Sequence, residues 1–187
     1  MRPVLILLTK AFADWETGLI AAQGRDWFGM DVRLASPDGG DVTSMGGLTA
    51  SHLAPFHPQG DEVIVICGGL IWKTDAAPDL TAPLRAAHDR GQPIAAICGG
   101  TLALARAGLL DDLGHTSNAL AFLRDNAAGY AGAAHYRTSP RAVQDRGIIT
   151  APGTAPASFA ALVLGAAGAS AADMAQLQAE LAAEYQP

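Results

Sequence analysis

Short, continuous apolar runs are the first pattern along this chain. They occupy residues 4–8, 62–67 and 94–97, and the second run ends directly at a pair of glycines. Such runs are typical of strands that helices cover on both faces of a parallel sheet. Weaker strand patterns fall at residues 31–35, 115–117 and 142–150, the last interrupted by the turn Asp145-Arg146-Gly147, and two glycine pairs frame a hairpin around Val42 and Leu48.

Segments with apolar residues at helical spacing separate these strands. They predict helices over residues 19–28, 78–90, 102–110 and 120–123, with two more at the end of the chain. Asn118 is expected to cap the fourth helix. Ser170 and Asp173 form a capping box for the last, whose apolar face holds Met174, Leu177, Leu181 and Tyr185. The alternation predicts an α/β fold, a doubly wound, mostly parallel sheet with helices on both faces.

Length and charge narrow the class of protein. The chain has 187 residues, half of them hydrophobic, which fits one domain over residues 1–187. Its net charge of −6 and the lack of any Lys/Arg cluster argue against nucleic acid as a partner. The first apolar run is too short for a signal peptide, and no stretch is long enough to cross a membrane, so we expect a cytoplasmic protein. No residue spacing suggests a metal site or a cofactor.

Cys98 is the outstanding candidate for chemistry. It stands between a buried strand and a helix and is followed by Gly99 and Gly100, the layout of a nucleophile elbow. The start of a helix also favours the thiolate form of a cysteine. The alternative is a small buried cysteine that packs a strand end. In a doubly wound sheet ligands bind beyond the carboxyl ends of the strands, here in the loops after Leu8, Cys67, Ile97 and Thr150.

The chain also resembles a known family. The segments 96–101, 104–110 and 115–118 are similar to the central signature of the ThiJ/PfpI family, the Parkinsonism-associated deglycase type within the class I glutamine-amidotransferase-like superfamily. The likeness extends to residues 14–16, 67–69 and 148–156, and so covers most of the chain in order. It implies a flavodoxin-like, glutamine-amidotransferase-like fold and a homodimer.

The resemblance also implies roles for individual residues. Cys98 corresponds to the reactive cysteine of the family, Glu16 to the acid that hydrogen-bonds the sulfur, and Gly69 and Gly99 to backbone donors that would stabilise an oxyanion. A carboxyl group beside a thiolate should share a proton with it. The alternative for Glu16 is an ordinary carboxylate at a helix start. Further candidates for the pocket are Asp14, Trp15, Gly68, Trp72, Gly100, Thr101 and Thr154. The alternatives are a core or rim position for the two tryptophans and helix capping for the two threonines.

One departure from the family pattern bears on the mechanism. Many relatives have histidine directly after the cysteine, where this chain has Gly99, so no Cys-His-acid triad is apparent. His115 is the best candidate to approach the sulfur, and His135 is a weaker one, although a lone histidine is more often simply packed or solvated. Cys67 could resolve an oxidised Cys98, but a buried thiol is the simpler reading.

Three functions remain open on this evidence. The first is a cysteine hydrolase or lyase that acts on a small-molecule substrate, a carbonyl compound, amide or related electrophile. Its relatives include amidases, glyoxalase and deglycase enzymes and isonitrile hydratases, and protease activity is the least supported. The second is a redox or stress-response protein in which Cys98 is oxidised without turnover. The third is an inert scaffold that binds partners.

Overall fold

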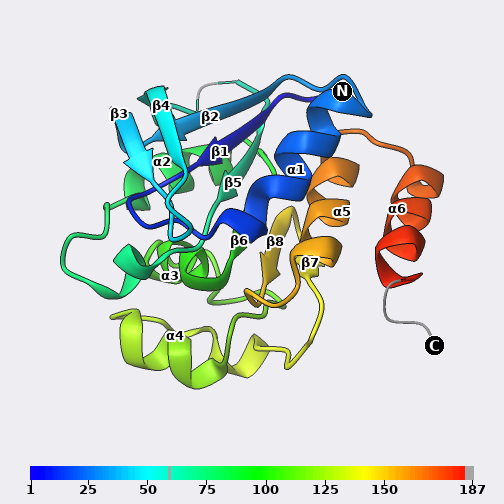
Figure 1. Ribbon diagram of the computed structural model, residues 1–187. Coiled ribbons are helices and arrows are strands. Elements are labelled where there is room, and N and C mark those ends of the chain that lie inside the picture. Colours follow the sequence, from blue (N-terminus) through cyan, green and yellow to red (C-terminus); the bar gives the residue numbers. More distant parts are fainter. Residues whose placement is uncertain (59, 184–187) are drawn as a thin grey trace.

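The computed structural model describes residues 1–58 and 60–183 and contains one eight-stranded sheet (Figure 1). The strand order is β3-β4-β2-β1-β5-β6-β8-β7. Neighbours from β4 to β8 in this order pair in parallel, and β3 and β7 pair antiparallel at the two edges. The strands are β1 (Val4–Leu7), β2 (Val32–Ser36), β3 (Asp38–Thr43), β4 (Thr49–Pro55), β5 (Val63–Ile66), β6 (Ile94–Ile97), β7 (Val143–Asp145) and β8 (Ile148–Ala151).

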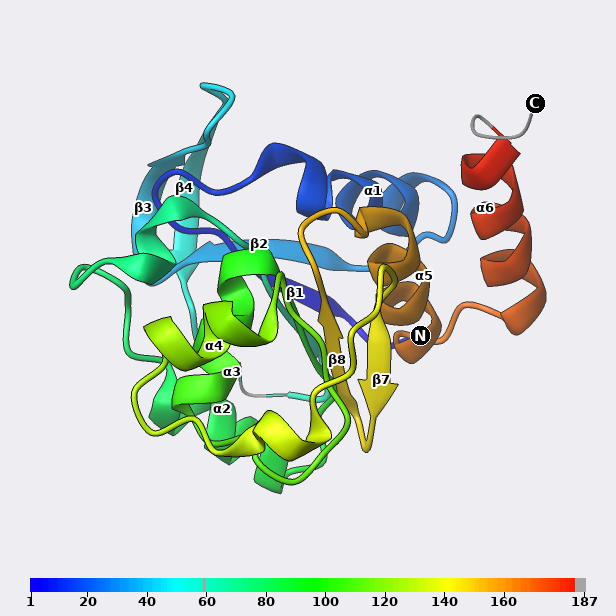
Figure 2. The same ribbon diagram turned by 90° about the horizontal axis from the view of Figure 1, so that it is seen from below.

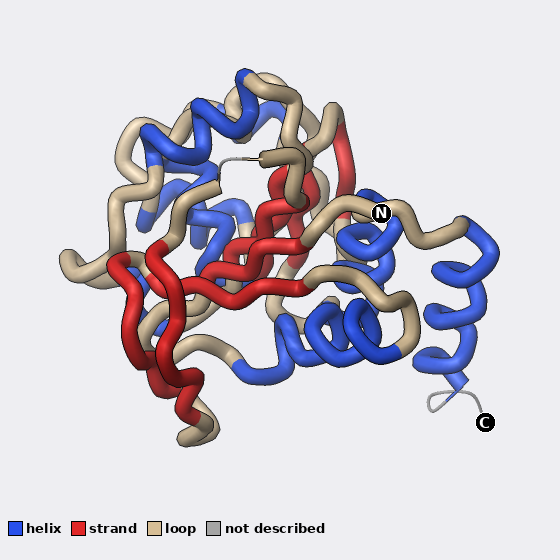
Figure 3. The backbone as a smooth tube through the Cα atoms, turned by 90° about the horizontal axis from the view of Figure 1, so that it is seen from above, coloured by secondary structure: helices blue, strands red, loops and turns tan. Residues whose placement is uncertain are grey.

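Helices cover both faces of the sheet, so the predicted fold class is confirmed (Figures 2 and 3). One face carries α1 and α5, with α6 packed outside α5, and the other face carries α2, α3 and α4. None of the described helices combines the length and the apolar character that crossing a bilayer requires. The helices are α1 (Asp14–Asp26), η1 (Leu70–Lys73), α2 (Thr81–Asp89), η2 (Cys98–Gly100), α3 (Thr101–Arg106), α4 (Leu120–Asn126), η3 (Gly132–His135), α5 (Pro156–Ala166) and α6 (Ala171–Ala183).

The central strands are buried on both faces because each supplies side chains to two separate cores. Alternate residues of one strand point to opposite faces of the sheet. Val63 and Val65 of β5 pack toward Phe159 of α5, whereas Ile64 and Ile66 pack in the core that α2, α3 and α4 cover. This division explains why β1, β5 and β6 read as continuous apolar runs in the sequence.

Most predicted elements are confirmed, including the hairpin around Val42 and Leu48 and the Ser170–Asp173 capping box, in which Asp173 N–H donates to Ser170 Oγ at 3.1 Å. The strand pattern over residues 142–150 forms two antiparallel strands, β7 and β8, on either side of its turn. The predicted strand at residues 115–117 is wrong, since only an isolated bridge joins His115 to Tyr136. The helix predicted to reach residue 110 ends at Arg106 in α3. Tyr185, expected on the last helix, lies outside the described residues.

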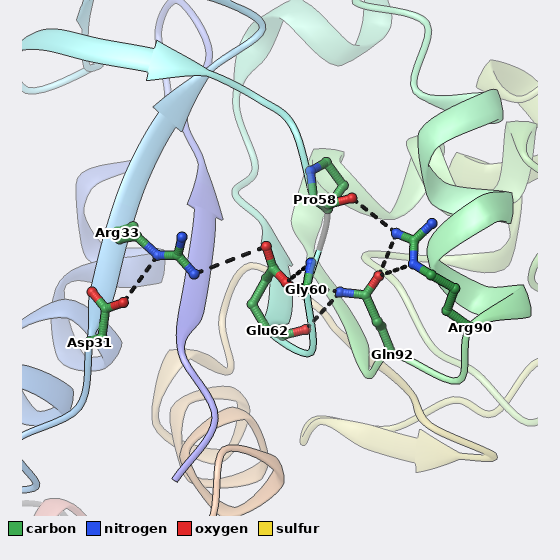
Figure 4. A network of polar contacts seen from close by, with 7 residues as sticks. All are labelled: Asp31, Arg33, Pro58, Gly60, Glu62, Arg90 and Gln92. Atoms are coloured by element: carbon green, nitrogen blue, oxygen red, sulfur yellow. Dashed lines mark hydrogen bonds and ion pairs between the residues drawn. The ribbon is translucent and has the colours of Figure 1, made fainter.

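The two ends of the sheet differ in character. At the amino ends of the central strands, Glu62 is buried and forms a structural polar network (Figure 4). Gln92 Nε2 donates to Glu62 Oε2 at 3.2 Å, and Arg90 in turn donates to Gln92 Oε1. The loops that follow β1, β5, β6 and β8 meet at the carboxyl ends, where a doubly wound sheet binds ligands.

Candidate active site

Cys98 stands at the elbow that the sequence predicted, directly after β6. Its backbone has φ +54°, a left-handed conformation that is rare for a residue with a side chain and that recurs at functional sites. Gly99 and Gly100 make this bend sterically accessible. A β-carbon at Gly100 would lie 2.6 Å from the Ile66 carbonyl oxygen, and one at Gly99 would lie 2.8 Å from the Gly69 carbonyl oxygen.

Thr101 stabilises the bend at Cys98 through its side-chain hydroxyl. Its hydroxyl donates to the Cys98 carbonyl oxygen at 2.6 Å and lies 2.7 Å from Ser117 Oγ. The side chain is fully buried, so Thr101 supports the bend and does not line an open pocket.

Glu16 brings a carboxyl group to this elbow from the first turn of α1. The side chain is fully buried, and its Oε2 accepts a hydrogen bond from Gly68 N–H at 2.7 Å. Its Oε1 is buried and makes no conventional hydrogen bond within the described part of the chain. A β-carbon at Gly68 would overlap Glu16 Oε2 and lie 2.8 Å from Cys98 Cβ. The carboxyl and the thiol are therefore brought together, as the family resemblance implied, and Gly68 leaves the space between them.

The two groups influence each other's protonation. Burial raises the pKa of Glu16 to about 7, which the interaction with Cys98 and the Gly68 hydrogen bond partly oppose. Burial also raises the pKa of Cys98, and the negative charge of Glu16 raises it further. The expectation that a helix start favours the thiolate is wrong in direction. Burial and the neighbouring carboxyl raise the pKa of the thiol and so favour its protonated form.

Of the two backbone donors that the family resemblance implied, Gly99 contacts the sulfur and Gly69 is part of a bridge between two loops. A backbone hydrogen bond from Gly99 to Cys98 lowers the pKa of the thiol. Gly69 lies in the short antiparallel bridge to Phe12. The two hydrogen bonds of that bridge run from Ala13 N–H to Gly68 O and from Leu70 N–H to Ala11 O, so they do not use the Gly69 N–H.

Asn118 and Gly153 are site residues that the sequence analysis did not assign. Asn118 Nδ2 donates to Cys98 Sγ at 3.3 Å, and Asn118 Oδ1 accepts from Gly153 N–H at 2.9 Å. The predicted helix-capping role of Asn118 is wrong, because the cap residue of α4 is Ala119 and no side chain caps it. Trp15 completes the arrangement by donating its indole N–H to the Gly153 carbonyl oxygen at 3.1 Å. With 52% of its surface exposed, Trp15 lies at the rim of the site.

The structure does not bring the predicted histidine to the sulfur. His115 is fully buried, with Nδ1 2.8 Å from the Leu113 carbonyl oxygen and Nε2 2.6 Å from the Tyr130 hydroxyl. Both ring nitrogens are thus engaged away from Cys98, and burial lowers the pKa of His115, which favours the neutral ring. His135 is exposed in η3, and its carbonyl oxygen accepts from His115 N–H.

Three other pocket candidates have different surroundings from those expected. Trp72 is fully buried and donates to the Cys67 carbonyl oxygen at 2.9 Å, so it is a core residue beneath Gly99. Asp14 accepts from Gly46 N–H at 2.9 Å and so joins α1 to the β3–β4 hairpin. Thr154 is exposed and lines a groove of about 500 Å³ between α5 and α6, whose lining includes neither Cys98 nor Glu16.

Cys67 has the environment of a structural thiol. It is fully buried at the end of β5 and contacts Thr17 Oγ1 at 3.9 Å and the Ala13 carbonyl oxygen at 3.5 Å. Burial strongly raises its pKa, and the charge of Glu16 adds to this effect. These features fit the simpler of the two readings of Cys67, that of a packed thiol.

The fold and the site together define a doubly wound α/β protein with a cysteine elbow paired to a buried acid. The model of the DJ-1/PfpI family matches residues 2–166, and the chain belongs to this family.

Solved and curated relatives agree with this assignment. The crystal structure of the DJ-1 superfamily protein Atu0886 from Agrobacterium tumefaciens is 41% identical, with a TM-score of 0.92 and full coverage of both chains. Two proteins of Bacillus subtilis (strain 168) are named uncharacterized proteases. YdeA is 33% identical over 169 residues, which are 88% of this chain and 82% of YdeA. YoaZ is 32% identical over 173 residues, which are 87% of this chain and 82% of YoaZ.

Proposed function

We propose that this protein is a cysteine-dependent hydrolase or lyase that acts on a small carbonyl compound, amide or related electrophile. The observation that carries the proposal is the buried Glu16 carboxyl beside Cys98, with its pKa raised to about 7. An acid that titrates near neutral pH is suited to both donate and accept a proton during one catalytic cycle. Cys98 itself is the nucleophile, since it is partly exposed on a bend that projects its side chain from the sheet.

The reaction begins with one proton shared by the pair. Because burial and the charge of Glu16 raise the pKa of Cys98, this proton lies mostly on the sulfur. Its transfer to Glu16 leaves Cys98 as a thiolate, and the sulfur then forms a bond to the electrophilic carbon of the substrate. The electrons of the carbon–oxygen π bond move to the oxygen. We expect the Gly99 N–H, which hydrogen-bonds Cys98, to stabilise this oxygen, with Gly69 as a second candidate donor. Glu16 then delivers its proton to the oxygen or to a leaving group, and later accepts one from the water that releases the product.

Peptide hydrolysis is the less favoured variant of this reaction, although the Bacillus relatives are named proteases. An amine leaving group needs a general acid within reach of its nitrogen, which cysteine proteases provide as an imidazole beside the sulfur. Both nitrogens of His115 are engaged by Leu113 and Tyr130, and His135 is exposed in η3. A small aldehyde or isonitrile has no amine leaving group to protonate, so a single carboxyl group is sufficient for the proton transfers.

The test is turnover of methylglyoxal, simple amides, isonitriles and a casein substrate by the purified protein. We expect turnover of at least one small substrate, which is lost in Cys98→Ser and reduced at least about a hundredfold in Glu16→Gln. Cys67→Ser is the matched control. Cys67 is buried with its Sγ 4.0 Å from Glu16 Oε2, and serine keeps a donor at this position, so the variant should keep its activity. Turnover that persists in Cys98→Ser would overturn the proposal.

A second candidate, oxidation of Cys98 without turnover, is favoured by one specific observation. The sulfur has hydrogen-bond donors from Gly99 and Asn118, which would also bind the oxygen atoms of an oxidised cysteine. Rapid oxidation of Cys98 by peroxide, with no turnover of any tested substrate, would favour this function over the first.

A further inference from the structure

Asn118 makes two hydrogen bonds that converge on the reacting sulfur. It lies between Ser117 and α4, where its amide group touches Cys98 Sγ on one side and Gly153 N–H on the other. The side chain is exposed, so neither contact follows from burial in the core. Gly153 lies directly over the site, since a β-carbon there would lie 2.9 Å from Cys98 Sγ.

The chemistry of these partners fixes the orientation of the amide. A backbone N–H can only donate, so the group that faces Gly153 must be the Asn118 oxygen. The NH₂ group therefore faces Cys98 Sγ and donates to it. A second restraint comes from Trp15, whose indole N–H binds the Gly153 carbonyl oxygen and so holds the same residue from the opposite side.

We propose that Asn118 is a further catalytic residue of this site, which stabilises the Cys98 thiolate by donating a hydrogen bond from Nδ2. This inference rests on the proposed function, because it assigns Asn118 a role at the same reactive thiol. The Asn118 amide does not titrate, so proton transfer is left to Glu16. A hydrogen bond to a charged acceptor is stronger than a neutral one and is therefore made best when the sulfur is ionised.

The titratable groups that act on the sulfur are few. Glu16 of α1 acts on it through its charge, and Cys67 at the end of β5 interacts with it electrostatically. The contacts from the loops after β6 and β8 and from the segment before α4 are made by Gly99, Gly153 and Asn118, which do not titrate. A change at Asn118 should therefore shift the pH profile of Cys98 without removing the titration of Glu16.

Two variants separate the bond to sulfur from the bond to Gly153. Asn118→Asp keeps an oxygen acceptor for Gly153 N–H, but replaces the donor that faces the sulfur with a negatively charged oxygen. Asn118→Ala removes both bonds. Asn126→Asp is the matched control. It adds the same charge at the chain's other asparagine, whose Nδ2 donates to the Phe122 carbonyl oxygen within α4.

The experiment is the rate of alkylation of Cys98 by iodoacetamide between pH 5 and pH 10, with the modified cysteine identified by mass spectrometry and folding checked by thermal unfolding. At pH 7 we expect Asn118→Ala to react about tenfold more slowly than the wild type and Asn118→Asp to react more slowly still. The whole profile should move to higher pH, while Asn126→Asp should match the wild type.

Two results would overturn the inference. If Asn118→Asp has the wild-type profile, the residue serves only to hold Gly153. If Asn118→Ala also matches the wild type, then neither the hydrogen bond to Cys98 nor the hydrogen bond from Gly153 affects the thiol. The outcome is independent of the proposed function, because alkylation needs no turnover. A wild-type Cys98 that reacts no faster than Cys67 would instead contradict the proposed function itself.

Discussion

Glu16 and Cys98 meet at the backbone of Gly153. A β-carbon at Gly153 would lie 3.1 Å from Glu16 Oε1 and 2.9 Å from Cys98 Sγ, so the residue that closes the site has no space for a side chain. Both its polar backbone groups are bound, the N–H by Asn118 and the carbonyl oxygen by Trp15. The acid and the sulfur are thus enclosed by a segment that is held by hydrogen bonds from two other parts of the chain.

Gly153→Ala should therefore impair the site more than the fold. The added methyl group would push the sulfur or the carboxyl out of position, and we expect alkylation of Cys98 and any turnover to fall at least about tenfold. Both rates are to be measured beside thermal unfolding.

The matched control is Gly165→Ala in α5, where the nearest atom to the new β-carbon is Met174 Cγ at 3.8 Å. Alanine is favoured over glycine within a helix by about 1 kcal/mol, so this variant should be as stable as the wild type or more so. Equal reactivity of Gly153→Ala and wild type would show that Gly153 does not enclose the sulfur closely.

The stability of the protein should depend on pH through Glu16. Its carboxyl has a pKa of about 7 in the folded protein, against 4.5 for an ordinary glutamate. Between these values the folded state retains a proton that the unfolded state has released. Stability is therefore full below pH 4.5 and is lost as the pH rises through 7, by about 3 kcal/mol in all.

Urea unfolding of the wild type and Glu16→Gln at pH 4.5, 6 and 8 tests this expectation. The variant can still accept a hydrogen bond from Gly68 through its amide oxygen but has no carboxyl to ionise. We expect it to lack this decline and to be the more stable protein at pH 8. Parallel curves for the two proteins would mean that Glu16 titrates as an ordinary surface carboxyl.

His115 should contribute to stability and not to the chemistry of the thiol. Tyr130→Phe removes the hydroxyl that lies 2.6 Å from His115 Nε2, and we expect a loss of about 1 kcal/mol in the free energy of unfolding. The alkylation rate of Cys98 should not change. Tyr136→Phe is a comparison at the second ring that packs edge-on against His115, because its hydroxyl binds the Ser117 carbonyl oxygen instead. A large loss of Cys98 reactivity in Tyr130→Phe alone would return His115 to the catalytic site.

The sequence allowed the sheet and the elbow to be predicted because both depend on local patterns. Apolar runs identified β1, β5 and β6, and the glycines after Cys98 identified the bend. The pairing of Glu16 with Cys98 came from the family resemblance. The role of Asn118 could not be predicted, because it depends on where the loop after β8 lies relative to α4, a distance set by the whole fold.

The thiol's protonation was mispredicted for a related reason. The helix start is a local feature that can be read from the sequence, whereas the burial that raises the pKa of Cys98 is a tertiary property. Likewise, His115 follows the elbow helix in sequence but points toward Tyr130. Nothing in the sequence indicated that Asn118 contacts Cys98. Its position just before a predicted helix suggested only a helix cap.

We infer that Cys98 and Glu16 share a proton and titrate together. The most direct test of this inference is the pH dependence of Cys98 alkylation in the wild type and in Glu16→Gln, with Cys67 in the same samples as an internal reference. We expect Cys98 to react far faster than Cys67 and its rate to rise through an inflection near pH 7. In Glu16→Gln that inflection should disappear, and the loss of the neighbouring charge should lower the pKa of Cys98. Identical profiles in the two proteins, or equal reactivity of the two cysteines, would contradict the account.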